Sequence, residues 1–385
     1  MAIDNKDKKI LNVPHLRFPE FTEEWKAEQL DNIATLSKGI GISKEQLSED
    51  GEPCILYGEL YTKYKSEIIK QVESKTDING SKLKRSKAND VIIPCSGETA
   101  VDIATARCVP FDNILFGGDL NVISLHQYDG AFMSYQLNGK RKYDIARVAQ
   151  GVSIVHLYGE HLKAIKTYNP TLPEQQKIAK LLSLLDDRID TQNKIIEDLK
   201  KLKSAISERL FKSVKGFTVL LSDLCDIVKG KQINGENLSD SGNYYVMNGG
   251  TEPSGYYDNY NVEASTISIS EGGNSCGYVQ FNTSPFWSGG HCYSIQNIAD
   301  KVDNMYLYHY LKSNEDAIMK LRIGSGLPNI QKKDLAMFKI IVPKIEWQIK
   351  ISTFLSSLER KAEIEERIQN VMQKQKLYLL QQMFI

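Results

Sequence analysis

Residues 173–211 read PEQQKIAKLLSLLDDRIDTQNKIIEDLKKLKSAISERLF, and residues 346–384 repeat this pattern without a gap at a constant offset of 173 residues. The match already begins at Gly151 and ends where Phe211 falls on Phe384. The chain therefore contains two copies of one unit, made of a loop, a strand and a long helix.

Apolar residues in both copies alternate steps of three and four, which is the seam pattern of a coiled coil. The seam positions are Leu182, Leu185, Ile189, Ile196 and Leu199 in the first copy and Leu355, Leu358, Met372 and Leu379 in the second. A continuous helix over residues 174–211 would be about 57 Å long at about 1.5 Å per residue, too long for the inside of an ordinary globule. We predict that the two helices pair as an antiparallel coiled coil. The alternative is a pair of ordinary amphipathic helices in a bundle.

A shorter repeat aligns LDNIATLSKG at Leu30–Gly39 with LSDLCDIVKG at Leu221–Gly230, at an offset of 191 residues. Each copy thus begins alike, holds a middle of different length and ends with the shared helix. We predict a mixed α/β protein with two globular domains, a two-helix coiled coil between them and a pseudo-two-fold internal repeat. The predicted segments are a lead-in at 1–16, a first globular domain at 17–169, a first helical spacer at 170–215, a second globular domain at 216–342 and a second helical spacer at 343–385.

The two middles differ in composition. The first predicts strands at Cys54–Tyr57, Val91–Pro94, Ile114–Phe116 and Asn121–Leu125, and the second, rich in Gly, Asn, Ser and Tyr, predicts short strands joined by tight turns. A short helix is predicted near the end of each middle, at Ala131–Leu137 and at Met305–Leu311.

Composition sets limits on function. The chain of 385 residues is 41% hydrophobic and 25% charged, as in soluble globular proteins, and its formal net charge of zero gives no support to DNA binding by overall charge. The six cysteines lack the spacing of a metal site. The N-terminus has no apolar core of a signal peptide, and no apolar run is long enough to span a membrane. We expect a cytoplasmic protein without membrane contact or bound metal.

Three phrases carry a resemblance to a known family: PEQQKIAKLLSLLD at 173–186, EWQIKISTFLSSLE at 346–359 and RFPEFTEEW at 17–25. With them the chain resembles, over nearly its full length, the specificity (S) subunit of type I restriction–modification systems. The resemblance implies two target-recognition domains, here 17–169 and 216–342, that bind the two halves of an asymmetric site on double-stranded DNA. It also implies that this chain has no catalytic centre and binds no cofactor itself.

The resemblance further implies partners and their cofactors. Two modification subunits would methylate adenine with S-adenosylmethionine, and two restriction subunits would translocate and cut DNA with ATP and Mg. The phrase IEWQIK at Ile345–Lys350 departs from the more usual acidic-Gln phrase of the family, so we expect different contacts there.

Candidate DNA contacts follow from side-chain chemistry, since Lys and Arg suit phosphates and Ser, Thr, Glu, Asn, Tyr and His can reach bases. The candidates are Lys82, Lys84, Arg85, Lys87, Lys140, Arg141 and Lys142 for phosphates, Ser96, Glu98 and Thr99 at a turn after a predicted strand, and Tyr244, Tyr245, Asn248, Asn274, Ser275, Ser288 and His291 in the second middle. The alternatives are a solvated charged loop for the basic runs, and turn or core packing for the Tyr and Asn residues.

Apolar residues beside the seam could receive helices of the modification subunits. These are Leu184, Ile195, Ile364, Ile368 and Val371, and the alternative is packing within the chain.

Enzyme motifs are weak. SPFW at Ser284–Trp287 lacks the second proline of an amino-methyltransferase motif, and EGGNSCG at Glu271–Gly277 lacks the lysine of a phosphate loop. Asp186 and Asp187 are adjacent carboxylates, which we expect to be exposed on the long helix. Two other hypotheses remain: an adaptor that binds proteins through two lobes without DNA, and, less favoured, a self-sufficient methyltransferase.

Overall fold

The computed structural model describes residues 12–79, 82–324, 326 and 328–385, so most of the lead-in predicted at 1–16 lies outside the described residues. The chain divides into two compact units. The first unit comprises the residues up to Asn193 together with Ile368–Ile385, and the second unit comprises Lys194–Arg367. Each unit holds a globular part and a stretch of two long helices.

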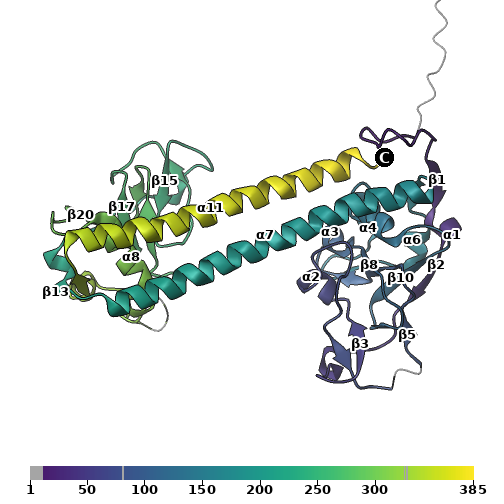
Figure 1. Ribbon diagram of the computed structural model, residues 1–385, viewed down its shortest axis with the longest axis horizontal. Coiled ribbons are helices and arrows are strands. Elements are labelled where there is room, and N and C mark those ends of the chain that lie inside the picture. Colours follow the sequence, from purple (N-terminus) through teal and green to yellow (C-terminus); the bar gives the residue numbers. More distant parts are fainter. Residues whose placement is uncertain (1–11, 80–81, 325, 327) are drawn as a thin grey trace, which may run out of the picture. The chain divides into compact units, whose positions relative to one another are not determined.

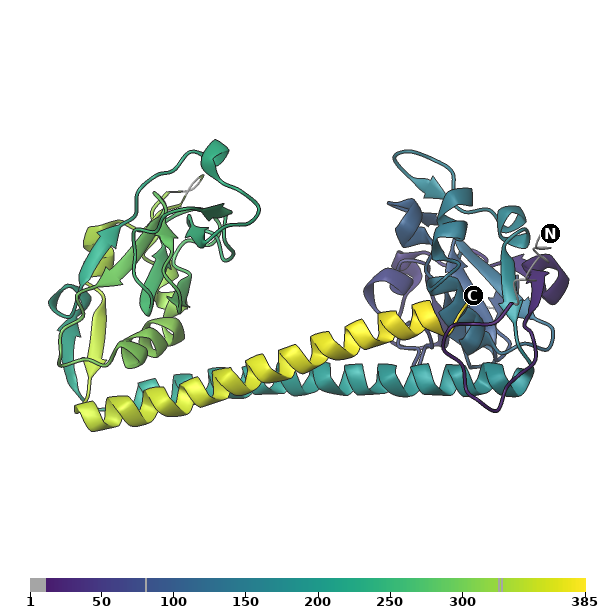
Figure 2. The same ribbon diagram turned by 90° about the horizontal axis from the view of Figure 1, so that it is seen from above.

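The long helices are α7 (Leu172–Ser213) and α11 (Ile345–Gln382), which pack together and confirm the predicted coiled coil (Figures 1 and 2). Their direction is antiparallel within each unit. In the first unit Asp186 pairs with Lys376 and Asn193 with Gln369, and in the second unit Lys200 pairs with Glu366 and Lys203 with Glu359, so residue numbers rise along α7 as they fall along α11.

A four-stranded antiparallel sheet in the order β2–β10–β6–β8 forms the centre of the first unit. Its strands are β2 (Ala34–Lys38), β10 (Leu120–Leu125), β6 (Asp90–Pro94) and β8 (Arg107–Val109). Both faces are buried, which explains the continuous apolar run of β6: Val91 lies in one core with Met133 of α4 (Gly130–Asn138), and Ile92 lies in another core with Phe116.

Smaller elements complete the first unit. They are β1 (Lys26–Gln29), α1 (Leu30–Ile33), η1 (Lys44–Gln46), β3 (Glu52–Ile55), α2 (Glu59–Thr62), β4 (Lys75–Thr76), β5 (Lys84–Arg85), β7 (Ser96–Gly97), α3 (Ala100–Ile103), β9 (Leu115–Phe116), α5 (Lys142–Val148), β11 (Val155–His156), α6 (Gly159–Lys163) and β12 (Lys166–Asn169). The four runs predicted as strands fall on β3, β6, β9 and β10, and the predicted short helix falls on α4.

The second unit repeats this topology. Its central sheet has the order β14–β20–β17–β18, formed by β14 (Asp226–Lys229), β20 (Cys292–Gln296), β17 (Thr266–Ser270) and β18 (Val279–Asn282). Helix α8 (Asn304–Ser313), the predicted short helix, packs on β18. The order is that of the first sheet, strand for strand, although the two middles differ in length and composition.

The remaining elements of the second unit also have counterparts in the first. They are β13 (Phe217–Leu220), η3 (Leu221–Asp223), η4 (Gly235–Asn237), β15 (Tyr244–Met247), β16 (Tyr256–Tyr257), β19 (Trp287–Ser288), α9 (Glu315–Met319), α10 (Lys332–Ala336) and β21 (Lys339–Val342). The pair β15 and β19 is parallel, as is the pair β3 and β9. The antiparallel pair β13 and β21 corresponds to β1 and β12.

A buried glutamine near the start of each long helix anchors that helix to the globular part. Gln175 accepts a hydrogen bond from the Asp129 amide (2.9 Å) and donates to the Pro170 carbonyl (2.8 Å). Its counterpart Gln348 accepts from the Asp303 amide (2.8 Å) and also donates to a proline carbonyl. This explains why the glutamine is shared by the two repeated phrases.

The residue before this glutamine is where the copies differ, as expected from the phrase IEWQIK. Glu174 is buried and accepts two hydrogen bonds of 2.7 Å from Arg17, which fastens the N-terminal segment to α7. At the same position of the second copy stands Trp347, which is 59% exposed. Leu16 donates its amide to the Gln382 carbonyl (2.8 Å), so this part of the lead-in packs on the end of α11.

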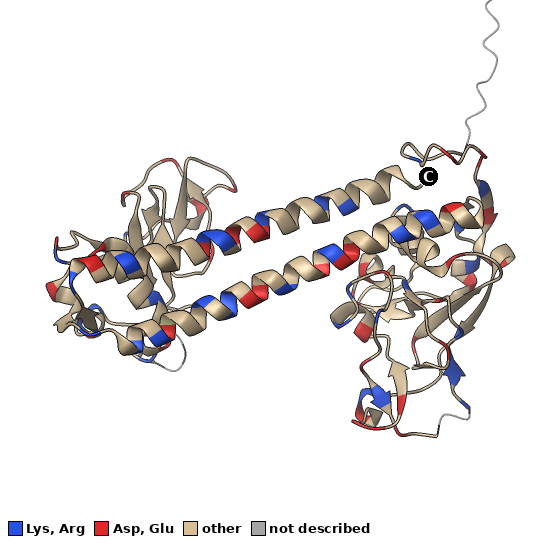
Figure 3. Cartoon of the chain, viewed as in Figure 1, with Lys and Arg blue, Asp and Glu red and all other residues tan. Residues whose placement is uncertain are grey.

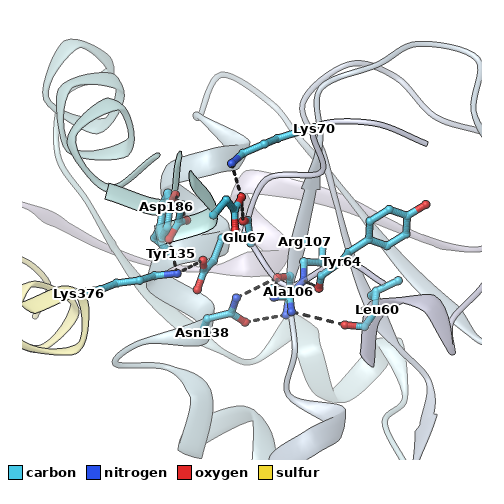
Figure 4. Close-up of polar contacts among 12 residues, drawn as sticks. Leu60, Tyr64, Glu67, Lys70, Ala106, Arg107, Tyr135, Asn138, Asp186 and Lys376 are labelled. Atoms are coloured by element: carbon cyan, nitrogen blue, oxygen red, sulfur yellow. Dashed lines mark hydrogen bonds and ion pairs between the residues drawn. The ribbon is translucent and has the colours of Figure 1, made fainter. Parts of the chain in front are cut away.

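A largely buried polar cluster joins both helices to the globular part of the first unit (Figure 4). Lys376 lies 2.6 Å from Asp186 and 2.5 Å from Glu67, and Tyr135 donates to Asp186 (2.7 Å). Burial opposes the charge on Lys376, but the two carboxylates outweigh it and raise the pKa of the lysine. Asp186 is only 4% exposed, so the expectation of an exposed carboxylate was wrong for this residue. The sequence did not reveal the reason, because Glu67 and Tyr135 come from distant segments.

The second unit repeats the lysine, one carboxylate and the tyrosine of this cluster at an offset of 173 residues. Lys203 pairs with Glu359, and Tyr308 donates to Glu359 (3.2 Å). The lysine in each unit comes from the helix of the other copy. Each globular part is therefore tied to both helices.

We predict that Lys376→Met lowers the free energy of unfolding by about 3–5 kcal/mol, because it leaves two carboxylates buried without their shared cation. Urea unfolding followed by circular dichroism measures the loss. The control is Lys201→Met, which removes an exposed lysine paired with Glu197 and is expected to leave the midpoint unchanged. Equal effects of the two variants would contradict the assignment of the cluster.

Candidate nucleic-acid interface

Seven of the ten polar candidates lie at one edge of the central sheet, at the equivalent place in both units: Ser96, Glu98, Thr99, Asn248, Asn274, Ser275 and His291. In the first unit β6 ends and β10 begins there, and the Cys95 amide donates to the Asp119 carbonyl (2.7 Å). In the second unit β17 ends and β20 begins there, and the Glu271 amide donates to the His291 carbonyl (2.9 Å). We call this the loop edge, formed by Tyr57, Cys95–Thr99, Asp119 and Ser153 in the first unit and by Asn248, Glu271–Ser275 and His291 in the second.

A cleft of about 680 Å³ opens at the loop edge of the first unit. The polar residues that line it are Tyr57, Tyr61, Thr62, Ser96, Glu98, Asp102, Thr105, Arg107 and Ser153. Ser96 holds the rim together, since its carbonyl accepts from Tyr61 (3.1 Å) and its hydroxyl lies 3.3 Å from His156. Glu98 is exposed at this rim. Thr99 instead caps α3 by accepting from the Asp102 amide (3.1 Å).

The loop edge of the second unit brings four of the sequence candidates together. Asn248 accepts from the His291 amide (3.1 Å), while Asn274 and Ser275 lie in the turn after β17. The backbone after Asn248 passes close to His291, and this requires glycine at position 249. Gly249 has φ of +85°, and a Cβ there would lie 3.0 Å from the His291 carbonyl oxygen. Asn248 and His291 are thus in contact, and Asn274 and Ser275 follow three and four residues after Glu271, whose amide donates to the His291 carbonyl.

The chemistry at the loop edge differs between the units. The residue after β6 is Cys95, a thiol whose burial raises its pKa to about 11, so that it is neutral near pH 7. The residue after β17 is Glu271, which pairs with Lys229 (2.7 Å) and accepts from Tyr293 (3.1 Å). The two copies therefore present one scaffold with unlike side chains.

Several candidates have structural roles. Ser288 is fully buried on β19, which removes it from the candidate surface, because the parallel pairing with β15 encloses it. Tyr245 is half-buried, stacks on Phe286 at 5.6 Å and donates to Asn282 (3.1 Å). Tyr244, also half-buried, lies 4.9 Å from the ring of Tyr260.

The basic candidates in and near β5 differ in availability. Lys82 and Lys87 are exposed, Lys84 is half-buried, and Arg85 makes two hydrogen bonds to Glu52 (2.5 and 2.9 Å). The lysines outside the Arg85 pair are the better phosphate candidates.

The basic run between α4 and α5 faces the chain's own C-terminal segment. Arg141 donates to the Ile385 carbonyl (2.8 Å) and pairs with Asp144 (3.1 Å), Lys140 is half-buried, and burial lowers the pKa of Lys142. Figure 3 shows acidic and basic residues interspersed on α7, on α11 and on both globular parts.

The seam residues and the outer residues predicted on the long helices differ in exposure. All nine seam residues are buried or half-buried. The outer residues are exposed, at 51% for Leu184, 39% for Ile195, 47% for Ile364, 38% for Ile368 and 65% for Val371. An apolar stripe therefore remains open on each helix.

Sequence reasoning missed Tyr57, Ser153 and Glu271 at the loop edge, and also Tyr61 and Lys229, which contact Ser96 and Glu271 there. A usable signal for Glu271 was its place directly after a buried strand and before a glycine-rich turn. Among the described residues, groups of His, Cys, Asp and Glu that could hold a metal ion are absent. The described helices include none that is long and apolar enough to cross a membrane.

A family model described as the type I restriction modification DNA specificity domain matches residues 22–201 and 216–374. A putative type I specificity subunit of Mycoplasma genitalium is 34% identical over 122 residues, which are 31% of this chain and 31% of the relative. The chain thus spans about a third of that relative. The MjaVIII specificity subunit of Methanocaldococcus jannaschii is 24% identical over 420 residues, covering 96% of this chain and 94% of the relative.

Solved structures show a similar fold. The S subunit of a type I restriction–modification system from M. genitalium has a TM-score of 0.68 at 19% identity, covering 97% of this chain and 99% of that chain. A chain from a study of the assembly and conformational transition of the type I system has a TM-score of 0.57 at 16% identity, covering 92% of this chain and 96% of that chain.

We predict that Ile196→Asp lowers the free energy of unfolding by more than about 2 kcal/mol, whereas Ile195→Asp lowers it by less than about 1 kcal/mol. The neighbouring side chains are 7% and 39% exposed, so only the first substitution buries a carboxylate. Urea unfolding of both variants measures the difference. Similar losses would show that Ile195 is also enclosed.

Proposed function

Because the chain belongs to the family of type I restriction–modification specificity subunits, we propose that it selects the DNA sequence on which such a complex acts. Residues 17–169 and 216–342 would be its two target-recognition domains. Each would bind one half of a split, asymmetric site on double-stranded DNA. The chain would carry no catalytic centre and no cofactor of its own.

The observation that carries this proposal is the duplicated loop edge. Both units place polar side chains at equivalent strand ends of two equivalent sheets, yet the residue after the central strand is Cys95 after β6 and Glu271 after β17. One scaffold with two sets of side chains suits a protein that reads two different sequences. Base edges are read by such hydrogen-bonding groups, while phosphate contacts position the protein.

Charge indicates that the chain does not bind DNA tightly alone. Its 48 basic residues equal its 48 acidic residues, and Arg85 and Arg141 pair with carboxylates. Because affinity for DNA depends on phosphates neutralised by Lys and Arg, Lys82 and Lys87 would supply only a small part. Most of this affinity would come from partner subunits.

Two modification subunits are the proposed partners on the outer apolar stripe of the long helices. Exposed apolar residues on a helix suit packing of further helices into a larger bundle. The modification subunits would supply S-adenosylmethionine chemistry on adenine, and two restriction subunits would supply ATP- and Mg-dependent translocation and cleavage. The complex would act in the cytoplasm.

We predict that the complex of this chain with the modification subunit enriches one split motif from a random-sequence DNA pool, as measured by sequencing of the bound DNA. The two halves of the motif are expected to differ, because the two loop edges differ. The modification subunit alone is the control and should enrich no such motif. A complex that enriches nothing would favour an adaptor that binds only proteins.

We predict that Ile195→Asp and Ile368→Asp each reduce co-purification with the modification subunit at least about tenfold, a change of about 1.4 kcal/mol. The reason is that a charge placed on the outer stripe must be desolvated when a helix packs there. Lys201→Asp, on the exposed face of α7 away from the seam, is the control. Intact complexes from both isoleucine variants would remove the proposed docking face.

A further inference from the structure

Glu271 of the second unit has a carboxylate oxygen for which the described residues provide no hydrogen bond. Its side chain is 9% exposed, and its Oε1 atom is engaged by Lys229 at 2.7 Å and by Tyr293 at 3.1 Å. Its Oε2 atom is buried and lacks a hydrogen-bond partner within the described residues. Leaving a buried acceptor unpaired costs about 1–3 kcal/mol, more when the acceptor is charged.

His291 lies directly against this oxygen. Its Nδ1 atom is 3.8 Å from Glu271 Oε2, just outside hydrogen-bond distance, while 63% of its side chain is exposed. The backbone of His291 is held on both sides, since its amide donates to Asn248 (3.1 Å) and its carbonyl accepts from Glu271 (2.9 Å). Only the imidazole is free to move.

A small rotation of the imidazole would therefore satisfy the buried oxygen. When Nδ1–H donates to a carboxylate, the histidine is fixed in one tautomer and its second nitrogen, Nε2, becomes a hydrogen-bond acceptor. Nδ1 faces the buried carboxylate, so Nε2 belongs to the exposed part of the ring. The surroundings are polar, because His291 lies against Asn248 and against Gly249 and Gly272, which flank it.

We propose that His291 reads a base of the second half-site, and that Glu271 positions it. Nε2 would accept a hydrogen bond from an exocyclic amino group in the major groove, which adenine and cytosine carry. This inference rests on the proposed function and adds to it a named residue and a class of base. The first unit, with Cys95 and Asp119 at these two positions, would read its half-site by different contacts.

The test uses the complex with the modification subunit and the random-sequence DNA pool. His291→Ala should weaken discrimination at one base pair of the second half-site about twofold to tenfold, the range of a single hydrogen bond to a base. The first half-site should stay unchanged. Glu271→Gln should weaken discrimination at the same base pair, by less, because an amide can still hold Nδ1–H. The control His126→Gln alters an exposed histidine that follows the opposite end of the equivalent strand, β10.

The outcomes separate this inference from the proposed function. If the unaltered complex enriches no motif, the proposed function fails. If it enriches a split motif that His291→Ala leaves unchanged at every position, the reading role of His291 is wrong. Thermal unfolding adds a second readout: a loss over the whole second half-site, with a lowered midpoint for Glu271→Gln, would assign Glu271 a merely structural role.

Discussion

The largely buried contact between Lys376 and Asp186 is the interaction on which the architecture of the first unit depends. A buried carboxylate needs a compensating cation and hydrogen bonds, and here both helices and the globular part must be in place to provide them. The ion pair between Asp186 and Lys376 fixes the register of α11 relative to α7 in the first unit. The apolar seam alone would tolerate a shift by one heptad, because its residues are similar from one turn to the next.

Much of this fold could be predicted from the chain because its decisive signals are local. The heptad pattern of the long helices, the repeated glutamine phrase and the strands of the first middle are visible within short windows, and the structure places helices and strands there. The shared topology of the two middles could not be predicted, because it lies in the order of strands. That order is set by pairings such as β10 with β6, between segments separated in sequence.

The candidate site was predicted less completely, for the same reason. Polar residues after strands pointed to the loop edge, and Ser96, Asn248 and His291 are there. The burial of Ser288 and the importance of Glu271 depend on distant partners: Lys229 and Tyr293 lie 42 and 22 residues away from Glu271. Arg85 and Arg141 looked like free cations in the sequence, but each has a carboxylate partner.

The exchange of lysines between the copies has a consequence for how this chain can evolve. A substitution that removes the charge of Asp186 requires a compensating substitution at Lys376, which belongs to the other copy. A substitution at Glu359 likewise requires one at Lys203. The duplicated helices are therefore bound to change together. Among the described residues, the partners of Glu271 come from its own copy, so the strand ends of one half can change without a matching change in the other half or in the long helices.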